Sequence, residues 1–227
     1  MNINDYVIVS DFDGTITTCD SNNLLFDDFG TSENKIIEEQ VRSGELCDRE
    51  AYIKHYDAKP LTYEQYNEFL DEHIKIDRTF AAFYSKVNSK GLSFYIVSGG
   101  FRHAISRVLR QFNIPKINIF SNDVIMEKHL KPLFAQSGSV CTEDIGPCGN
   151  CKKTCIETIR ELTNKKILFI GDGSTDRCAV RVSDYIFAKG SLAKYCDTMG
   201  IDYHSFNDFA DISNIIFNQQ MRLDCFA

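Results

Sequence analysis

Residues 7–17, VIVSDFDGTIT, place two aspartates two residues apart directly after an apolar run. The run is typical of a buried strand, and Asp11 and Asp13 follow where that strand should end. Two carboxylates this close repel each other unless a cation or a proton lies between them. The stretch therefore predicts a central strand with a charged site at its carboxyl end.

The composition limits the class of protein. A chain of 227 residues is long enough for one domain or two small ones. Its formal net charge of −7 argues against nucleic acid or an anionic membrane as the main partner. No run of 18 apolar residues occurs, and the first residues have no basic region, so we expect neither a membrane span nor a signal peptide. Nine cysteines without an export signal favour a reduced, cytoplasmic chain.

Short apolar segments rich in β-branched and aromatic residues recur along the chain, with helix-like segments between them. This alternation predicts an α/β fold, a Rossmann-like parallel sheet with helical crossovers. Residues 122–136 look like an inserted hairpin. The expected strands are 6–10, 92–98, 117–121, 166–171 and 185–188, and the expected helices are 101–111, 154–162, 176–183 and 192–199.

Residues 18–90 differ from the rest because they lack strand runs. They have the pattern of several amphipathic helices, with breaks near Gly30, Gly44 and Pro60. We expect a helical cap inserted after the first strand, with residues 1–17 and 91–227 forming the catalytic core. The alternative is that these helices simply pack on the sheet.

Polar residues follow several of the expected strands or begin a helix. In open α/β sheets, the carboxyl ends of the strands form the edge where ligands bind. Asp11, Asp13, Asp172 and Asp176 should therefore meet in one crevice. The motifs are DFDGT at 11–15, SGGF at 98–101, NCKKT at 150–154 and GDGSTD at 171–176.

Four carboxyls in one crevice favour a hard divalent cation with oxygen ligands, and Mg²⁺ fits this description. Lys152 adds positive charge, Ser98 a hydroxyl, and Gly99 and Gly100 allow backbone N–H groups to approach an anion. Together these groups predict a site for phosphoryl transfer.

Simpler motifs do not fit. A calcium loop that begins at Asp11 would need glycine at its sixth position and glutamate at its twelfth, but Ile16 and Asn22 stand there. Neither the G-x-x-x-x-G-K-[ST] phosphate loop nor the G-x-G-x-x-G dinucleotide fingerprint occurs.

The four motifs, in this order, resemble those of the haloacid dehalogenase superfamily, and the resemblance covers nearly the whole chain. The helical cap between the first two motifs resembles the phosphoserine phosphatase-like branch. Within that branch, CGNCKKT, FIGDGSTDRCAVRVSDYIFAKGSL and GIDYHSFNDF look like the 2-hydroxy-3-keto-5-methylthiopentenyl-1-phosphate phosphatases of methionine salvage. The cysteines before the lysine also resemble the phosphoethanolamine/phosphocholine phosphatases.

The resemblance implies a role for each matching residue. Asp11 matches the nucleophile that becomes an aspartyl-phosphate, and Asp13 matches the general acid/base. The implied Mg²⁺ ligands are the Asp11 carboxylate, the Asp13 main-chain carbonyl and Asp172. Lys152 matches the lysine that screens phosphate and nucleophile, and Asp176 matches an acidic residue that supports the metal and the lysine.

The implied substrate contacts are Ser98 and Gly99 for the phosphate, and Asp20, which matches a position that often faces substrate. The implied partner is a small phosphorylated metabolite, preferably 2-hydroxy-3-keto-5-methylthiopentenyl-1-phosphate. Phosphoserine and phosphoethanolamine or phosphocholine remain alternatives. We expect a monomer or homodimer. An alternative of another class is a metal-binding or regulatory protein with a vestigial site.

Several residues leave a choice open. Lys153 competes with Lys152, although the spacing to the following helix favours Lys152. His103 either reaches the crevice or lies at the surface, and the second is favoured. The cysteines at 141, 148, 151 and 155 either bind a structural metal or are ordinary thiols, and the single C-x-x-C pair favours thiols.

Overall fold

The computed structural model describes residues 2–114, 117–136 and 148–218. In these parts of the chain, seven strands form one sheet in the order β4-β3-β2-β1-β5-β6-β7. Every neighbouring pair is parallel except β3 and β4, which form the predicted hairpin. The predicted α/β class is confirmed. The strands are β1 Tyr6–Ser10, β2 Phe94–Phe101, β3 Asn118–Met126, β4 Leu130–Leu133, β5 Lys166–Gly171, β6 Tyr185–Ala188 and β7 His204–Ser205.

The central strand β1 is buried on both faces. Successive side chains of a strand point to opposite faces of the sheet. Accordingly, Val7 and Val9 belong to one apolar cluster and Ile8 to another, and all three are fully buried. This explains why the strand is continuously apolar rather than alternating.

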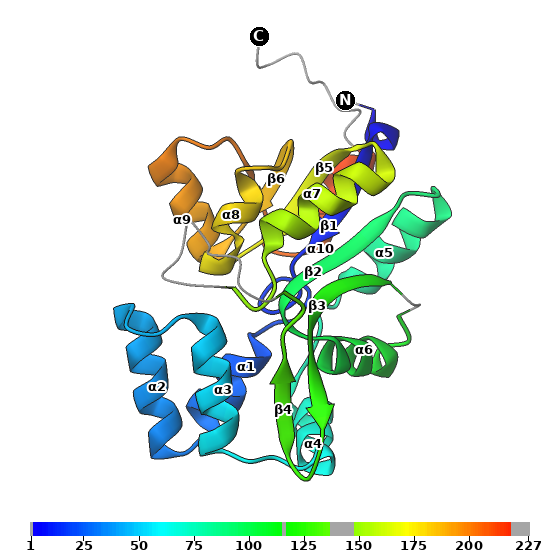
Figure 1. Cartoon of the computed structure of the whole chain (residues 1–227). Coiled ribbons are helices and arrows are strands. Elements are labelled where there is room, and N and C mark those ends of the chain that lie inside the picture. The colour runs from blue at the N-terminus through cyan, green and yellow to red at the C-terminus, as the bar shows by residue number, and fades with distance from the viewer. Residues whose placement is uncertain (1, 115–116, 137–147, 219–227) are drawn as a thin grey trace.

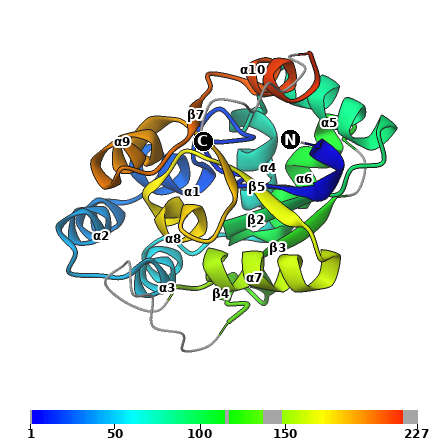
Figure 2. The same ribbon diagram turned by 90° about the horizontal axis from the view of Figure 1, so that it is seen from above.

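Helices cover both faces of the sheet. Figure 2 shows α7 on one side and α5, α6 and α10 on the other. Helices α8 and α9 share the apolar cluster of α7. No helix in the described ranges is long and apolar enough to cross a membrane. The helices that cover the sheet are α5 Phe80–Ser89, α6 Arg102–Gln111, α7 Lys152–Thr163, α8 Arg177–Val180, α9 Gly190–Met199 and α10 Phe209–Ser213.

The helix predicted over 176–183 is present only as one turn, at Arg177–Val180. The chain instead makes a 3₁₀ turn at Ser174–Asp176, and then the one-turn helix α8. The turn is tight because Oδ2 of Asp176 accepts hydrogen bonds from the backbone N–H groups of Asp172 and Gly173. This carboxylate therefore orders the segment that follows β5.

The insertion after β1 is helical, as predicted. Helices α2 and α3 lie side by side at the lower left of Figure 1. Thr31 and Thr62 begin α2 and α4 with capping boxes, and Gly44 ends α2 with a φ of 81°. The elements are α1 Ser21–Asn23, a π turn at Leu24–Asp28, α2 Ser32–Ser43, α3 Asp48–Ala58 and α4 Tyr63–His73.

Helix α5 packs on the sheet although it lies within the range expected for the cap. The ring of Phe80 contacts Phe94 of β2 at 5.9 Å and Phe209 of α10 at 4.9 Å between centroids. We therefore propose a division in which α5 joins the core, and the elements from α1 to α4 form the cap.

Phe80→Ala should destabilise the catalytic core, because Phe80 is fully buried in its apolar cluster. We expect a loss of about 3–5 kcal/mol in the free energy of unfolding, measured by urea titration. Ile36→Ala in α2 is the control: this side chain is 57% exposed, and its removal should change stability by less than about 0.5 kcal/mol. Equal effects of the two substitutions would contradict the proposed place of α5.

Candidate active site

The polar ends of the strands meet in one cavity of about 670 Å³. Asp11 follows β1, Ser98 lies near the end of β2, and Asp172 follows β5. Helices α2 and α3 close the other side of the cavity, since Glu38, Arg42, Asp48 and Tyr52 also line it. The core and the helical insertion thus share one site.

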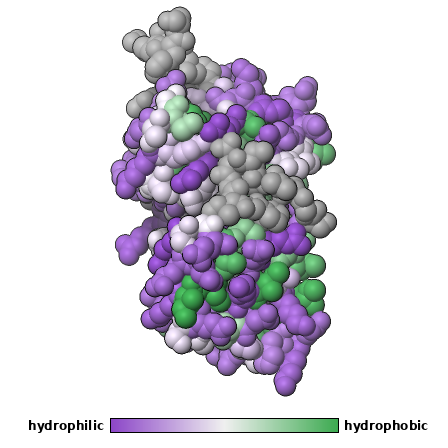
Figure 3. All heavy atoms as spheres, turned by 60° about the vertical axis from the view of Figure 1, so that its left-hand side comes forward, coloured by the Kyte–Doolittle hydropathy of each residue, from purple (hydrophilic) through white to green (hydrophobic). Residues whose placement is uncertain are grey.

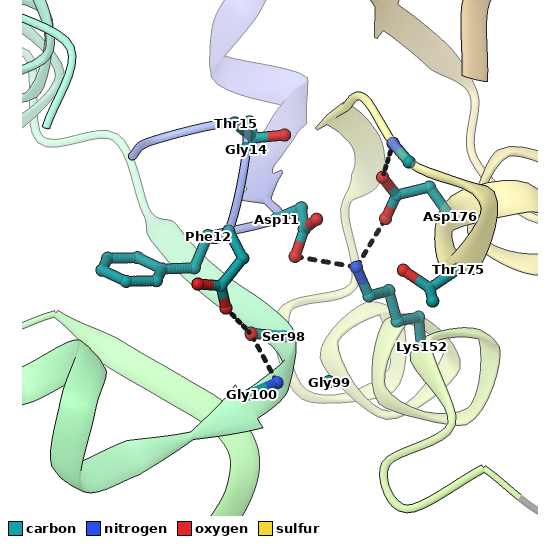
Figure 4. A network of polar contacts seen from close by, with 12 residues as sticks. Asp11, Phe12, Gly14, Thr15, Ser98, Gly99, Gly100, Lys152, Thr175 and Asp176 are labelled. Atoms are coloured by element: carbon teal, nitrogen blue, oxygen red, sulfur yellow. Dashed lines mark hydrogen bonds and ion pairs between the residues drawn. The ribbon is translucent and has the colours of Figure 1, made fainter. Parts of the chain in front are cut away.

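Lys152 lies at the centre of the polar contacts in Figure 4. Its Nζ is 2.7 Å from Oδ1 of Asp11 and 2.6 Å from Oδ1 of Asp176. All three residues are buried, whereas Lys153 is exposed. Of the two candidate lysines, Lys152 is therefore the one that enters the site.

The charges around Lys152 shift the pKa values of its neighbours. Burial would lower the pKa of Lys152, but Asp11 and Asp176 outweigh burial and raise it, so the ammonium stays charged. Burial, with Asp176 and Asp172 nearby, raises the pKa of Asp11 despite the opposing effect of Lys152. The single ammonium of Lys152 therefore does not balance the negative charge of the neighbouring carboxylates.

Asp172 completes the carboxylate group. Oxygen atoms of Asp11, Asp172 and Asp176 all lie within 4.8 Å of one another. Both oxygens of Asp176 already accept hydrogen bonds, from Lys152 and from backbone N–H groups, which fits the predicted supporting role. Hard carboxylate oxygens in this arrangement fit the ligand chemistry of Mg²⁺.

The DFDGT turn aims Asp172. Thr15 Oγ1 donates a hydrogen bond to Oδ1 of Asp172. Gly14 has a φ of 74°, and a Cβ at this position would lie 2.5 Å from Oδ2 of Asp172. Only glycine allows both this backbone conformation and this close approach.

Asp13 faces a different part of the cavity, so its side chain is not in the carboxylate group. Its Oδ1 accepts hydrogen bonds from the N–H of Ser21 at 3.1 Å and from Oγ of Ser21 at 2.5 Å. Its Oδ2 lies 3.4 Å from Oγ of Ser98. Burial raises the pKa of Asp13, although the hydrogen bonds from Ser21 oppose the shift. The predicted metal contact of its main-chain carbonyl stays a prediction.

Asp20, Ser98 and Gly99 line the same cavity, and their role as substrate contacts stays a prediction. Oδ1 of Asp20 caps α1 by accepting from the N–H groups of Asn22 and Asn23. Burial and the neighbouring Asp13 raise the pKa of Asp20 to about 7. Ser98 Oγ accepts a hydrogen bond from the N–H of Gly100 at 2.9 Å.

Other candidates lie elsewhere. His103 Nε2 is 2.8 Å from Oδ1 of Asn67, and its ring packs against Tyr63 and Tyr66, so this histidine joins α6 to α4. Among the described residues, Asp11, Asp172 and Asp176 are the one group of potential metal ligands whose oxygen, nitrogen or sulfur atoms lie close enough to share an ion. No cysteine belongs to this group. Cys141 lies outside the described residues.

Four residues were missed by the sequence reasoning. Thr15 and Ser21 donate to the site aspartates, and Asn122 and Asn150 donate to backbone carbonyls of the SGGF segment. Thr15 stands inside the DFDGT motif, which was a signal for its role. Asn150 stands inside the NCKKT motif, but its partners and those of Asn122 are far away in sequence, so no spacing shows what the two amides contact.

Comparison with known proteins agrees with this geometry. The family model for haloacid dehalogenase-like hydrolases matches residues 8–181. The chain belongs to this family. The predicted superfamily is thereby confirmed, and the strand-end site described above lies in a hydrolase.

Individual relatives are similar over most of their length. Over 216 residues the chain is 31% identical to the 2-hydroxy-3-keto-5-methylthiopentenyl-1-phosphate phosphatase of Bacillus velezensis, covering 93% of this chain and 90% of that one. It is also 31% identical over 216 residues to Pdp3-interacting factor 1 of Schizosaccharomyces pombe, with 90% and 92% covered. Among solved structures, the chain is similar to a phospho-aspartyl intermediate analogue of phosphoserine phosphatase. The TM-score is 0.70 at 19% identity, and the match covers 92% of this chain and 98% of that one. This last likeness supports the fold.

Gly14→Ala should impair Mg²⁺ binding, because the added Cβ would displace the carboxylate of Asp172. We expect at least a tenfold weaker affinity for Mg²⁺ by isothermal titration calorimetry. Gly91→Ala is a matched control: Gly91 has a φ of 66°, but a Cβ there meets nothing within 4 Å. Both substitutions should cost about 1–2 kcal/mol of stability through backbone strain. Equal Mg²⁺ affinity in the two variants would contradict the role of this close approach.

Proposed function

We propose that this hydrolase is a Mg²⁺-dependent phosphatase of small phosphorylated metabolites, with Asp11 as the nucleophile. The observation that carries the proposal is the buried pairing of Lys152 with Asp11 and Asp176, beside Asp172. Family membership and the phosphatases among its relatives support the same reading. Asp11 and Asp172, with the main-chain carbonyl of Asp13, would hold the ion.

In the first step, an oxygen of Asp11 forms a bond to phosphorus and the ester P–O bond breaks. Asp13 gives its proton to the leaving oxygen, for which its raised pKa is suited. Lys152 neutralises charge on the nucleophile and the phosphoryl group, so that the two anions can approach each other. Bound Mg²⁺ would supply further electrostatic stabilisation of the phosphoryl oxygens.

In the second step, water attacks phosphorus and the bond between Asp11 and phosphorus breaks. Asp13, now ionised, accepts the proton from this water. Ser98 and Gly99 would hold the phosphate from the β2 side, and Asp20 would face the leaving group. The products are the free alcohol and inorganic phosphate.

The preferred substrate in this proposal is 2-hydroxy-3-keto-5-methylthiopentenyl-1-phosphate, as in the Bacillus relatives. Phosphoserine is less suitable, because the cap arginines are already engaged. Arg42 pairs with Asp27 at 2.9 Å, and Arg49 donates to the backbone carbonyl of Gln136 and lies over the ring of Phe134.

A second candidate substrate is phosphoethanolamine or phosphocholine. The cap side of the cavity presents Asp20, and a carboxyl group there favours a leaving group that carries a cation or hydrogen-bond donors. A metal-binding or regulatory protein with a vestigial site is disfavoured, because Asp11, Asp13 and Lys152 are all present in the cavity.

The proposal also includes a cytoplasmic monomer or homodimer without nucleic-acid or membrane partners, in keeping with the acidic charge.

Asp11→Asn should abolish turnover, since an amide cannot form the acyl phosphate. We expect a fall in kcat of about 10⁴-fold or more, measured by phosphate release with Mg²⁺. The matched control is Asp5→Asn, which removes an exposed carboxylate away from the cavity and should leave kcat unchanged. Turnover that survives in Asp11→Asn would refute the assignment of the nucleophile.

A panel of phosphorylated metabolites should separate the substrates. We expect the highest kcat/KM with 2-hydroxy-3-keto-5-methylthiopentenyl-1-phosphate, and activity that disappears with EDTA and returns with Mg²⁺. A higher kcat/KM with phosphoethanolamine or phosphocholine would select the second candidate. Activity that is undiminished by EDTA would remove Mg²⁺ from the proposal.

A further inference from the structure

Asn150 connects the segment that carries Lys152 to the SGGF segment at the end of β2. Its side chain is only 6% exposed. Nδ2 donates to the carbonyl oxygens of Ser98 at 2.9 Å and Phe120 at 3.1 Å, and Oδ1 accepts from Sγ of Cys155 at 3.1 Å. Every polar atom of this amide therefore has a partner, in β2, β3 or α7.

Asn122 makes a similar contact one residue further along the same SGGF segment. It is 1% exposed, its Nδ2 donates to the carbonyl oxygen of Gly99 at 2.7 Å, and its Oδ1 accepts from the N–H of Ala135 at 3.1 Å. The successive carbonyls of Ser98 and Gly99 are thus each held by a buried amide.

These contacts fix the directions of the N–H groups of Gly99 and Gly100. The described residues contain no cis peptide bond, and in a trans peptide the C=O and N–H groups point in opposite directions. With the carbonyl of Ser98 held by Asn150, the N–H of Gly99 points away from Asn150. With the carbonyl of Gly99 held by Asn122, the N–H of Gly100 points away from Asn122 and donates to Oγ of Ser98. Gly99 lines the cavity, and a Cβ there would meet nothing within 4 Å.

The SGGF end of β2 is irregular, so the strand ladder alone does not hold it. The register between β2 and β3 shifts between Val97 and Phe101, which takes the intervening residues out of regular pairing. Irregularities of this kind often re-aim backbone groups beside active sites. The two asparagines supply the hydrogen bonds that fix the conformation here.

We infer that Asn150 and Asn122 are positioning residues for the phosphate contact: Asn150 aims the N–H of Gly99 at the phosphate group of the substrate, and Asn122 holds the next peptide, whose N–H donates to Oγ of Ser98. The inference rests on the proposed function, and it deepens that function by identifying what preorganises the phosphate contact. Because Asn150 stands two residues before Lys152, one short segment sets both the lysine and the backbone donor.

An asparagine suits this task better than residues of similar size. Its NH₂ group offers two donors, and Asn150 uses them on two carbonyls. An aspartate would place acceptors against those carbonyls, and a leucine would leave both buried carbonyls without this partner.

The test compares Asn150→Leu and Asn122→Leu with the wild-type chain. We measure the inhibition constant of inorganic phosphate, and kcat and KM for p-nitrophenyl phosphate with Mg²⁺. Each substitution should raise the inhibition constant about tenfold or more, and kcat should fall because a preorganised donor is misplaced. The control Asn67→Leu removes another buried amide, at the contact of α4 with α6, and should leave the inhibition constant within twofold.

A second measurement uses the unmodified protein, so it does not depend on the folding of a variant. Selective ¹⁵N-glycine labelling gives amide signals from 13 glycines, and triple-resonance assignment of the wild-type chain identifies the signal of Gly99. That signal should shift when phosphate and Mg²⁺ bind, and a Gly99 signal that stays in place would overturn the inference.

The outcomes separate the two proposals. If the wild-type chain hydrolyses no phosphomonoester, the proposed function fails and the inference fails with it. If the wild-type chain is active, and folded Asn150→Leu and Asn122→Leu keep the wild-type inhibition constant, the positioning role alone is overturned. The positioning role is also overturned if Asn67→Leu raises the inhibition constant as much as Asn150→Leu and Asn122→Leu do.

Discussion

The ion pairs of Lys152 with Asp11 and Asp176 constrain the rest of the structure. An ammonium or a carboxylate buried alone costs several kcal/mol, so each of these groups depends on the others. Lys152 comes from the start of α7, Asp11 from the end of β1 and Asp176 from the turn after β5. The pairs therefore hold three separate segments at one edge of the sheet, and any shift of one segment would leave a buried charge unpaired.

The charge in this group is not balanced, and the imbalance explains what the site can bind. One ammonium faces the carboxylates of Asp11, Asp172 and Asp176, which share a small volume. Burial raises the pKa values of Asp11 and Asp172, so the isolated site resists full ionisation. A divalent cation would restore the ionised form. The same positive charge would then attract a phosphate dianion to the nucleophile, so cation and substrate binding have one electrostatic origin.

Much of this arrangement could be predicted from the sequence, because it depends on local patterns. A buried strand followed by DFDGT predicts both β1 and the position of Asp11, and the parallel order of strands predicts that Asp172 lies nearby. The helix expected over 176–183 is shorter, and it begins only after Asp176 because this side chain ties backbone N–H groups in the preceding turn. The amphipathic pattern of α5 shows that one face is buried, but it does not show against what. Asn122 and Asn150 act through distant carbonyls, which no spacing in the sequence reveals.

The two sides of the cavity differ in how strongly the fold constrains them. On the core side, Asp176, Gly14 and Thr15 each have geometry that allows little substitution, because a carboxylate or a backbone N–H lies in direct contact. On the cap side, Glu38 and Arg42 lie on one helix, and Arg42 is largely exposed. The core side would set the chemistry, which needs a fixed arrangement of charges. The cap side would contact whatever lies beyond the phosphate, so it could change without disturbing the buried ion pairs. Substrate choice should therefore depend on α2 and α3, and the reaction itself on the ends of β1, β2 and β5.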